Sequence, residues 1–221
     1  MCMVRIFTLV LALVSYGFLA PNNPALAESE PEEAAVEVSE ADRAALLSVL
    51  PSDAVIGEDD APVTIIEYAS MSCPHCATFH LDVLPDLKER YISEGNAKLV
   101  MRHFPLNEPA LRAAMLTRCV PKDKYYTFLK VLFKTQDKWA FDADFKEQLS
   151  GIAKVGGMSQ EEFDACMDNS ELETTLLQER LEAMQALNIQ STPTFFVNGE
   201  KLQGSGDVEI FAKAIDPLLE E

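Results

Sequence analysis

The feature that most constrains the fold of this chain is a pair of cysteines, Cys73 and Cys76, at the boundary between two sequence patterns. Before the pair, the β-rich run Val63–Tyr68 predicts a short buried strand. After it, apolar residues recur at helical spacing, and Pro85 is expected to kink the helix that they predict. These apolar residues are Phe79, Val83, Leu84, Leu87 and Tyr91. The motif Cys73-Pro74-His75-Cys76 therefore stands where a strand is followed by a helix.

A second strand and a long helical segment follow. Lys98–Phe104 predicts a strand, and a right-handed crossover through the helix would make it a parallel neighbour of the first. From Asn107 to about Leu187 the chain shows amphipathic helices and no strand pattern, and one helix opens with the capping box Ser159-x-x-Glu162. This segment is therefore predicted to be a helical block inserted between strands.

The end of the chain returns to strand patterns. Thr194–Val197 and Lys201-Leu202 flank the turn pair Asn198-Gly199, which predicts a hairpin. A last helix is predicted over Val208–Leu219. The fold class is therefore α/β with an inserted α-helical domain, in which residues 52–106 and 188–221 form one domain and residues 107–187 the insertion.

The amino terminus has the pattern of a secretory signal. Arg5 precedes the apolar stretch Ile6–Leu19, and Ala25-Leu26-Ala27 supplies small residues at a cleavage position. Residues 1–27 are therefore predicted to be a signal peptide cut after Ala27. The alternatives are an uncleaved anchor or a buried helix, although a permanent span needs about 20 apolar residues.

An acidic lead-in is predicted after the signal. Glu28–Glu40 is rich in Glu, Ala and Ser and shows no apolar period, and Ala41–Leu50 predicts a short helix stopped by Pro51, so that the lead-in and helix occupy residues 28–51. The formal net charge is −18, and loss of Arg5 makes it −19. Such an acidic surface argues against nucleic acid and against anionic lipid as partners.

The position of the cysteine pair suggests disulfide exchange. A thiolate at a helix N-terminus has a lowered pKa, so Cys73 is expected to be the nucleophile and Cys76, one turn further in, the resolving thiol. The His75 ring can donate a hydrogen bond to the Cys73 sulfur, and Pro74 suits the first helical position. No cofactor is expected beyond the redox-active disulfide Cys73–Cys76.

Two other positions are candidates for a supporting role. Glu67 lies on the strand before Cys73, where its carboxylate either handles the Cys76 proton or simply faces water at a strand end. Thr192-Pro193 precedes the hairpin strand, where a cis bond would present the Thr192 backbone to a substrate strand, although most X-Pro bonds are trans.

The cysteines have other interpretations. Zinc would require His80, His103, Cys119 and Cys166 to converge, and neither a second CxxC nor regular zinc spacing is present, so no metal site is predicted. A purely structural disulfide loop would not explain the place of the pair at a strand–helix junction. Four cysteines remain after the signal, an even number that suits disulfides in an oxidising compartment.

These motifs together resemble the DsbA-like branch of the thioredoxin superfamily, over about Ser52 to Leu219. The similar segments are Tyr68–Cys76, Phe79-His80, Val83-Leu84-Pro85, Arg102–Leu106 and Thr192–Gly199. The resemblance implies a thioredoxin fold with an inserted helical domain, a cis Pro193, and oxidation of reduced or misfolded exported proteins in the periplasm. It also implies a membrane quinone-linked partner that reoxidises Cys73–Cys76.

The chain departs from the best-known DsbA pattern in two ways. Thr192 stands where strong oxidases often carry Val and where isomerases carry Thr, which leaves the direction of exchange open. Cys119 and Cys166 lie on apolar helical faces of the insertion and are expected to form a disulfide, the alternative being two buried free thiols. In the chain-entropy model a loop of about 48 residues stabilises by roughly 4 kcal/mol.

Three functions therefore compete. The first is a dithiol oxidase that donates the Cys73–Cys76 disulfide to exported proteins. The second is an isomerase or reductase that is kept reduced, suggested by Thr192 and by a possible association segment at Ala41–Leu50. The third, which the motifs favour least, is a metal-binding or chaperone protein.

Overall fold

The computed structural model describes residues 39–204 and 206–220. The predicted signal peptide, its cleavage position and the acidic lead-in up to residue 38 lie outside these residues. Within them, no helix combines the length and the apolar character needed to cross a membrane.

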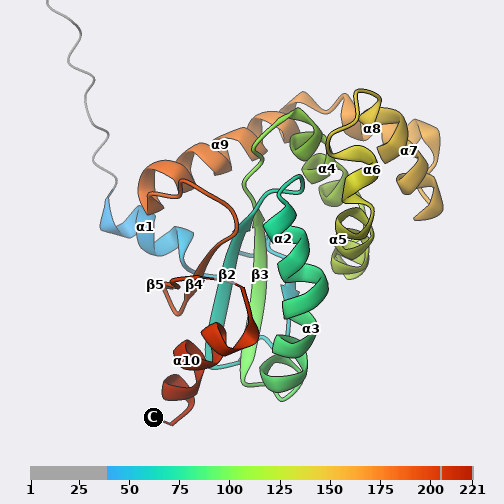
Figure 1. Cartoon of the computed structure of the whole chain (residues 1–221). Coiled ribbons are helices and arrows are strands. Elements are labelled where there is room, and N and C mark those ends of the chain that lie inside the picture. Colours follow the sequence, from blue (N-terminus) through green and yellow to red (C-terminus); the bar gives the residue numbers. More distant parts are fainter. Residues whose placement is uncertain (1–38, 205, 221) are drawn as a thin grey trace, which may run out of the picture. The chain divides into compact units, whose positions relative to one another are not determined.

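A five-stranded mixed sheet forms the centre of the described fold (Figure 1). Its strand order is β1-β3-β2-β4-β5, in which β2 and β3 are parallel and the other three pairs are antiparallel. The strands are β1 (Val55–Ile56), β2 (Val63–Ala69), β3 (Ala97–His103), β4 (Thr194–Val197) and β5 (Glu200–Lys201). The predicted parallel pair and the predicted hairpin are thus confirmed, whereas β1, only two residues long, was not predicted.

The helices fall into three groups along the chain. The first group precedes and follows β2: α1 (Glu40–Leu46), α2 (Pro74–Thr78), η1 (Phe79–Val83), α3 (Leu84–Leu87) and η2 (Lys88–Ile92). The second lies between β3 and β4: α4 (Glu108–Cys119), η3 (Lys122–Lys124), α5 (Tyr125–Lys134), α6 (Gln136–Trp139), α7 (Phe145–Val155), α8 (Gln160–Met167) and α9 (Ser170–Leu187). The last helix is α10 (Val208–Leu219). The inserted helical region is thus confirmed, while the domain boundaries drawn through it stay predictions.

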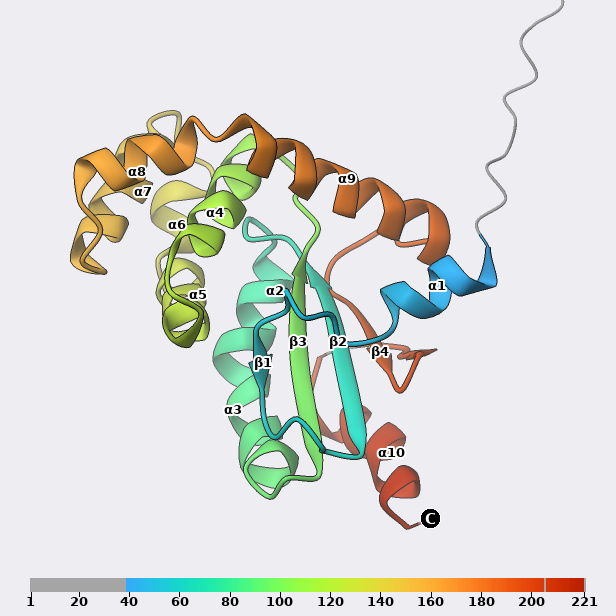
Figure 2. The same cartoon turned by 180° about the vertical axis from the view of Figure 1, so that it is seen from behind.

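Different helices cover the two faces of the sheet. Ile65, Leu99 and Phe195 pack against the helical run from η1 to η2 and against α10. On the opposite face, Ile66 and Phe196 pack against α1 and the last turns of α9. Figures 1 and 2 show α2 and α3 along one face of β2 and β3, and α9 running back from the inserted helices to the neighbourhood of α1.

The helix after the cysteine pair alternates between α and π turns. A π-helical turn, η1, ends at Val83, two residues before Pro85, and a second π turn, η2, ends the run at Ile92. A proline has no N–H to donate to the preceding turn, so a locally widened turn at this point has a direct cause. The predicted helix over Cys76–Tyr91 is confirmed, with π turns in place of a regular α-helix.

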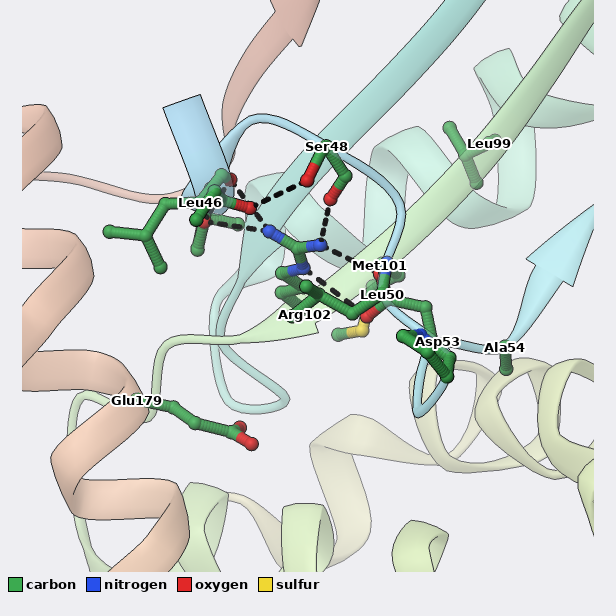
Figure 3. A network of polar contacts seen from close by, with 12 residues as sticks. Leu46, Ser48, Leu50, Asp53, Ala54, Leu99, Met101, Arg102 and Glu179 are labelled. Carbon is green, nitrogen blue, oxygen red and sulfur yellow. Dashed lines mark hydrogen bonds and ion pairs between the residues drawn. The ribbon is translucent and has the colours of Figure 1, made fainter. Parts of the chain in front are cut away.

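A buried arginine fixes the segment after α1 to the sheet (Figure 3). Arg102 on β3 donates to both carboxylate oxygens of Asp53, at 3.2 and 2.7 Å, and to the carbonyl oxygens of Leu46 and Ser48, each at 2.6 Å. It also donates to the Tyr68 hydroxyl at 3.2 Å. The carbonyl groups at the end of α1 are therefore satisfied by β3.

This arrangement corrects the predicted extent of the first helix. The helix ends at Leu46, whereas the pattern Ala41–Leu50 predicted four further residues. The Leu46 carbonyl accepts from Arg102 and from the Tyr68 hydroxyl, and the Leu50 N–H donates to Asp53 at 2.8 Å. Contacts with the sheet thus replace the hydrogen bonds that another helical turn would have made.

Candidate active site

The cysteine pair lies at the carboxyl end of the central strand β2. Cys73 caps α2 with extended backbone (φ −82°, ψ 121°), and Pro74 occupies the first turn, where a missing N–H leaves no hydrogen bond unmade. The Cys73 N–H donates to the Ser70 carbonyl at 3.0 Å, which closes the connection from β2. Cys73 is 7% exposed and Cys76 is fully buried, and both are free thiols.

The loop before β4 completes the surroundings of the Cys73 sulfur. The Cys73 thiol donates to the carbonyl oxygen of Thr192 at 3.2 Å. The Thr192–Pro193 peptide bond is cis. The Thr192 hydroxyl is buried and, among the described residues, has no hydrogen-bond partner, so it is available to donate to a Cys73 thiolate. The structure therefore brings the Thr192-Pro193 dipeptide to the cysteine pair.

The pKa of Cys73 is lowered to about 5. The largest cause is a hydrogen bond from the Cys76 thiol; the Thr192 hydroxyl and the backbone N–H groups of Cys76 and His75 add to it, while burial opposes it. All these donors favour the thiolate because they face its charge at a helix N-terminus. Cys73 is therefore a thiolate at neutral pH.

Cys76 behaves in the opposite way. Burial raises the pKa of Cys76 far above its usual range, and the hydrogen bond to Cys73 and the negative charge of Glu67 raise it further. The thiol of Cys76 thus keeps its proton and donates it in a hydrogen bond to the neighbouring sulfur. The two cysteines are divided into an ionised nucleophile and a protonated partner.

His75 contributes through its backbone. Its N–H helps to stabilise the Cys73 thiolate, whereas its side chain is exposed. Within the described chain no hydrogen bond joins the His75 ring to the Cys73 sulfur, in contrast to the contact expected from the sequence. The exposed ring instead lies on the surface, one residue from the nucleophile.

Glu67 is buried beneath the cysteine pair. Its side chain is fully inaccessible to solvent, so the alternative of a carboxylate facing water is wrong. One carboxylate oxygen, Oε2, lies 2.7 Å from Nε2 of His80, and the other, Oε1, has no hydrogen-bond partner among the described residues. The contact joins β2 to η1, directly after the cysteine-bearing helix.

Gln136 is a site residue that the sequence analysis missed. From α6 of the inserted region, its amide donates to the carbonyl oxygens of Met71 at 2.8 Å and Cys73 at 3.1 Å. It is buried and satisfies two carbonyls of the loop that carries the nucleophile. A single Gln in a helical segment forms no motif, so only the tertiary structure could reveal this role.

The other two cysteines lie apart from this site. Cys119 of α4 and Cys166 of α8 form a disulfide with Cα atoms 6.2 Å apart, beside Leu111, Met115 and Leu176. Met71, Cys73 and Cys76 pack in a different apolar cluster, with Phe133 and Trp139 of the inserted region.

His103, the other histidine considered as a zinc ligand, is engaged in hydrogen bonding. Its Nε2 atom lies 2.8 Å from the Thr117 hydroxyl and 3.0 Å from the Tyr125 hydroxyl. The structure therefore does not bring His80, His103 and the Cys119–Cys166 pair together into one cluster.

Comparisons with known proteins agree with this geometry. The family model described as Thioredoxin matches residues 50–217. The crystal structure of α-DsbA1 from Wolbachia pipientis is 33% identical, with a TM-score of 0.74 over 80% of this chain and 95% of that one. Oxidised BdbD from Bacillus subtilis is 25% identical, with a TM-score of 0.66 over 77% of this chain and 94% of that one.

A curated relative is longer than the present chain. A Rickettsia conorii protein whose name assigns it to the protein-disulfide oxidoreductases is 34% identical over 171 residues, which is 77% of this chain and 61% of that protein. The chain thus spans about three fifths of the length of this relative.

Proposed function

The chain belongs to the DsbA-like disulfide oxidoreductases of the thioredoxin fold, and from this premise we propose that it oxidises exported proteins by donating the Cys73–Cys76 disulfide. The observation that carries the proposal is the lowered pKa of Cys73, at about 5. Stabilising the Cys73 thiolate stabilises the reduced form of the pair, and a stabilised reduced form makes the disulfide a stronger oxidant.

The reaction follows from the unequal cysteines. A substrate thiolate attacks the accessible Cys73 sulfur of the Cys73–Cys76 disulfide, so that a mixed disulfide forms and Cys76 leaves with the electron pair and takes up a proton. A second substrate thiolate then attacks the substrate sulfur of the mixed disulfide, and Cys73 leaves as a stable thiolate. The substrate loses two electrons and gains a disulfide, and the enzyme pair is reduced to two thiols.

The surrounding residues have roles that suit this reaction. Thr192 presents its carbonyl beside the nucleophile, Pro193 follows it in the cis form, and Pro74 begins the helix that holds the pair. Glu67 lies where it can exchange the Cys76 proton. Cys119–Cys166 is a structural disulfide in this proposal, because it packs in a separate cluster from the exchanging pair.

Isomerisation is the second candidate, favoured by Thr192 beside the nucleophile. The equilibrium of Cys73–Cys76 with glutathione distinguishes an oxidase from a reductant. A strong oxidase has a potential near −120 mV, whereas a thioredoxin-like reductant lies near −270 mV. The low pKa of Cys73 leads us to expect a value toward the oxidising end, and a value near −270 mV would exclude the oxidase.

The activity itself is tested by refolding a reduced substrate protein. The oxidised protein should restore the disulfides of the substrate stoichiometrically without any other oxidant. A Cys73→Ser variant should not restore them. Continued oxidation of the substrate by the Cys73→Ser variant would show that Cys73 is not required for the reaction. A protein that instead rescues only scrambled disulfides, from its reduced state, would be an isomerase.

We further propose a periplasmic location, reached through a signal peptide cut after Ala27, with reoxidation by a membrane quinone-linked partner. The protein substrates are reduced or misfolded exported chains. Amino-terminal sequencing of the periplasmic protein tests the cleavage, which predicts Glu28 as the first residue. Oxidation of the reduced protein by membrane vesicles that contain quinone, and its loss on quinone extraction, tests the partner.

A further inference from the structure

A cavity of about 470 Å³ lies in the inserted region beside the second disulfide. Helices α4, α5 and α8 and the loop between α7 and α8 surround it, and Figure 2 shows these helices gathered in the inserted region. Its described lining residues do not include Cys73, Cys76 or Thr192. Pockets of about 300–1,000 Å³ hold small organic molecules in many proteins.

The walls of the cavity are mostly apolar. Both cysteines of the disulfide, Cys119 and Cys166, line it together with Val120, Phe128 and Met158. Phe128 is buried, whereas Val120 and Met158 are half-buried and reach the solvent. An apolar ligand would remove these side chains from water, which is favourable because of the hydrophobic effect.

Two features of the backbone keep this space open. The loop between α7 and α8 places Gly156 and Gly157 at the cavity, so no side chain enters from it. A Cβ atom at Gly156 would lie 2.8 Å from Cε2 of Phe128, too close for any other residue without a shift. The Cys119–Cys166 disulfide ties α4 to α8 at the same cavity. The walls are therefore preformed, and a preformed site loses less free energy to ordering when a ligand binds.

Among the described residues, one cation lines the cavity. It is Lys124, an exposed residue directly before α5. The chain has 36 acidic and 18 basic residues, so carboxylates are abundant, yet none of those described lies within ion-pair distance of Lys124. Its charge is therefore free to attract an anion to the cavity.

The second charged side chain at the cavity is already engaged. The Glu162 carboxylate accepts from the Ser159 N–H at 2.7 Å and thereby caps α8. This hydrogen bond lowers the pKa of Glu162, which stays ionised at neutral pH. Because the carboxylate of Glu162 serves the helix cap, Lys124 is the charged group left for a ligand. The two side chains should act on a bound anion with opposite signs.

We propose that this cavity binds a small apolar organic anion. Its acidic group lies at Lys124, and its hydrocarbon part lies against Val120, Phe128 and Met158. Medium-chain fatty acids and aromatic carboxylates share this chemistry. The site is separate from the proposed disulfide exchange and does not depend on it.

The test uses octanoate as the probe and 1-octanol as its uncharged counterpart. Both are titrated into the oxidised protein at physiological ionic strength and followed by heteronuclear NMR. We expect saturable octanoate shifts that concentrate on Lys124, residues 156–158 and Ala165, all of which line the cavity. Ala165 is exposed on α8, so Ala165→Phe introduces a ring at the cavity without adding one to the core. This variant should no longer bind octanoate.

The charge variants should change the affinity in opposite directions. Lys124→Gln should weaken octanoate binding about two- to fivefold, as expected for an exposed ion pair, and leave octanol binding unchanged. Glu162→Gln keeps an oxygen that can accept from Ser159 but removes the opposing charge, so it should strengthen octanoate binding by a similar factor. Lys122→Gln is the matched control, because Lys122 donates to the Pro51 carbonyl and does not line this cavity.

Three results would each overturn the proposal: octanoate shifts that concentrate elsewhere, equal effects of Lys124→Gln and Lys122→Gln, or unimpaired binding by Ala165→Phe. The charge variants replace exposed side chains, so they keep the test decisive if Ala165→Phe fails to fold. A dimer in analytical ultracentrifugation that Ala165→Phe dissociates, without octanoate binding, would instead assign the cavity to a second copy of the chain.

Discussion

The sulfur of Cys73 lies 3.2 Å from the carbonyl oxygen of Thr192, although 119 residues separate them in the chain. The contact joins the end of β2 to the loop before β4, on either side of the inserted helices. The reactivity of the first cysteine therefore depends on a segment that the chain reaches only after the whole insertion has been built.

The first prediction concerns the ionisation of Cys73. In the reduced protein the thiolate absorbance should titrate with a midpoint at pH about 5, and this transition should be absent from Cys73→Ser. Thr192→Val should move the midpoint upward, because it removes a hydroxyl that stabilises the thiolate. Thr192→Ser retains the hydroxyl and serves as the control. An unmoved midpoint in Thr192→Val would show that the Cys76 thiol and the backbone N–H donors suffice.

The second prediction concerns the stability of the reduced protein. Between about pH 5 and pH 8.5 the unfolded chain carries a proton on Cys73 that the folded chain has released, so the free energy of unfolding rises with pH. The slope for one proton is at most about 1.4 kcal/mol per pH unit. Above the unfolded value the raised pKa of Cys76 reverses the sign, because the folded chain then holds the extra proton.

Urea unfolding of the reduced protein, at a series of pH values, measures this dependence. The difference from Cys73→Ser isolates the contribution of Cys73 and should grow from pH 5 to pH 8.5. A difference that stays flat across this range would mean that the folded thiol titrates at its ordinary value.

The third prediction concerns Gln136. Gln136→Leu leaves the Met71 carbonyl buried without its side-chain donor, at a cost of about 1–3 kcal/mol, whereas the Cys73 carbonyl keeps the Ala77 N–H as a donor. We expect a lower free energy of unfolding and slower disulfide exchange. The relative decrease in the exchange rate should exceed the relative loss of secondary structure measured by circular dichroism. Gln178→Leu is the control, because the Gln178 amide bonds only Glu182, on the exposed face of α9. Equal effects of the two replacements would contradict a special role for Gln136.

The fourth prediction concerns Arg102. Arg102→Met should reduce the free energy of unfolding by about 3–5 kcal/mol, since it leaves the buried Asp53 carboxylate without its partner. Arg90→Met is the matched control, because the Arg90–Glu209 pair is largely exposed and such pairs contribute about 0–1 kcal/mol. Denaturant unfolding compares the two. Limited proteolysis should also show new cleavage between Leu46 and Asp53 in the Arg102 variant only.

The fifth prediction concerns the second disulfide. Replacing both Cys119 and Cys166 by Ala should lower the free energy of unfolding by about 4 kcal/mol, as expected for a loop of this length. The glutathione equilibrium of Cys73–Cys76 should change little, because the two pairs pack in separate clusters. A large change in that equilibrium, with folding retained, would assign the second disulfide a direct part in the exchange reaction.

Local patterns were sufficient for β2, β3 and the β4–β5 hairpin, and for the junction that carries the cysteines. The hairpin was predictable because Asn198 and Gly199 both adopt positive φ, 45° and 87°, which few other residue pairs accept. The burial of β2 followed from its β-branched run. These features depend on residues that are neighbours in the chain.

The features that the sequence did not reveal depend on distant partners. Helix α1 ends at Leu46 because Arg102 and Tyr68, more than twenty residues away, take the Leu46 carbonyl. Strand β1 has only two residues, too few to show an alternating apolar pattern. It forms because its backbone pairs with the edge of β3. Glu67 could be placed on its strand, but its contact with His80 required the helix to turn His80 back toward β2.

Because it contains the Cys119–Cys166 disulfide, this protein itself needs the kind of disulfide formation proposed as its function. Its four cysteines after residue 27 can pair in three ways, and only one pairing leaves Cys73 with Cys76. In a newly synthesised chain the Cys119–Cys166 disulfide has to form once and persist, whereas in the proposed function the Cys73–Cys76 disulfide forms and opens repeatedly. Under the proposed function, the protein therefore requires for its own Cys119–Cys166 bond the same disulfide formation that it would provide to its substrates.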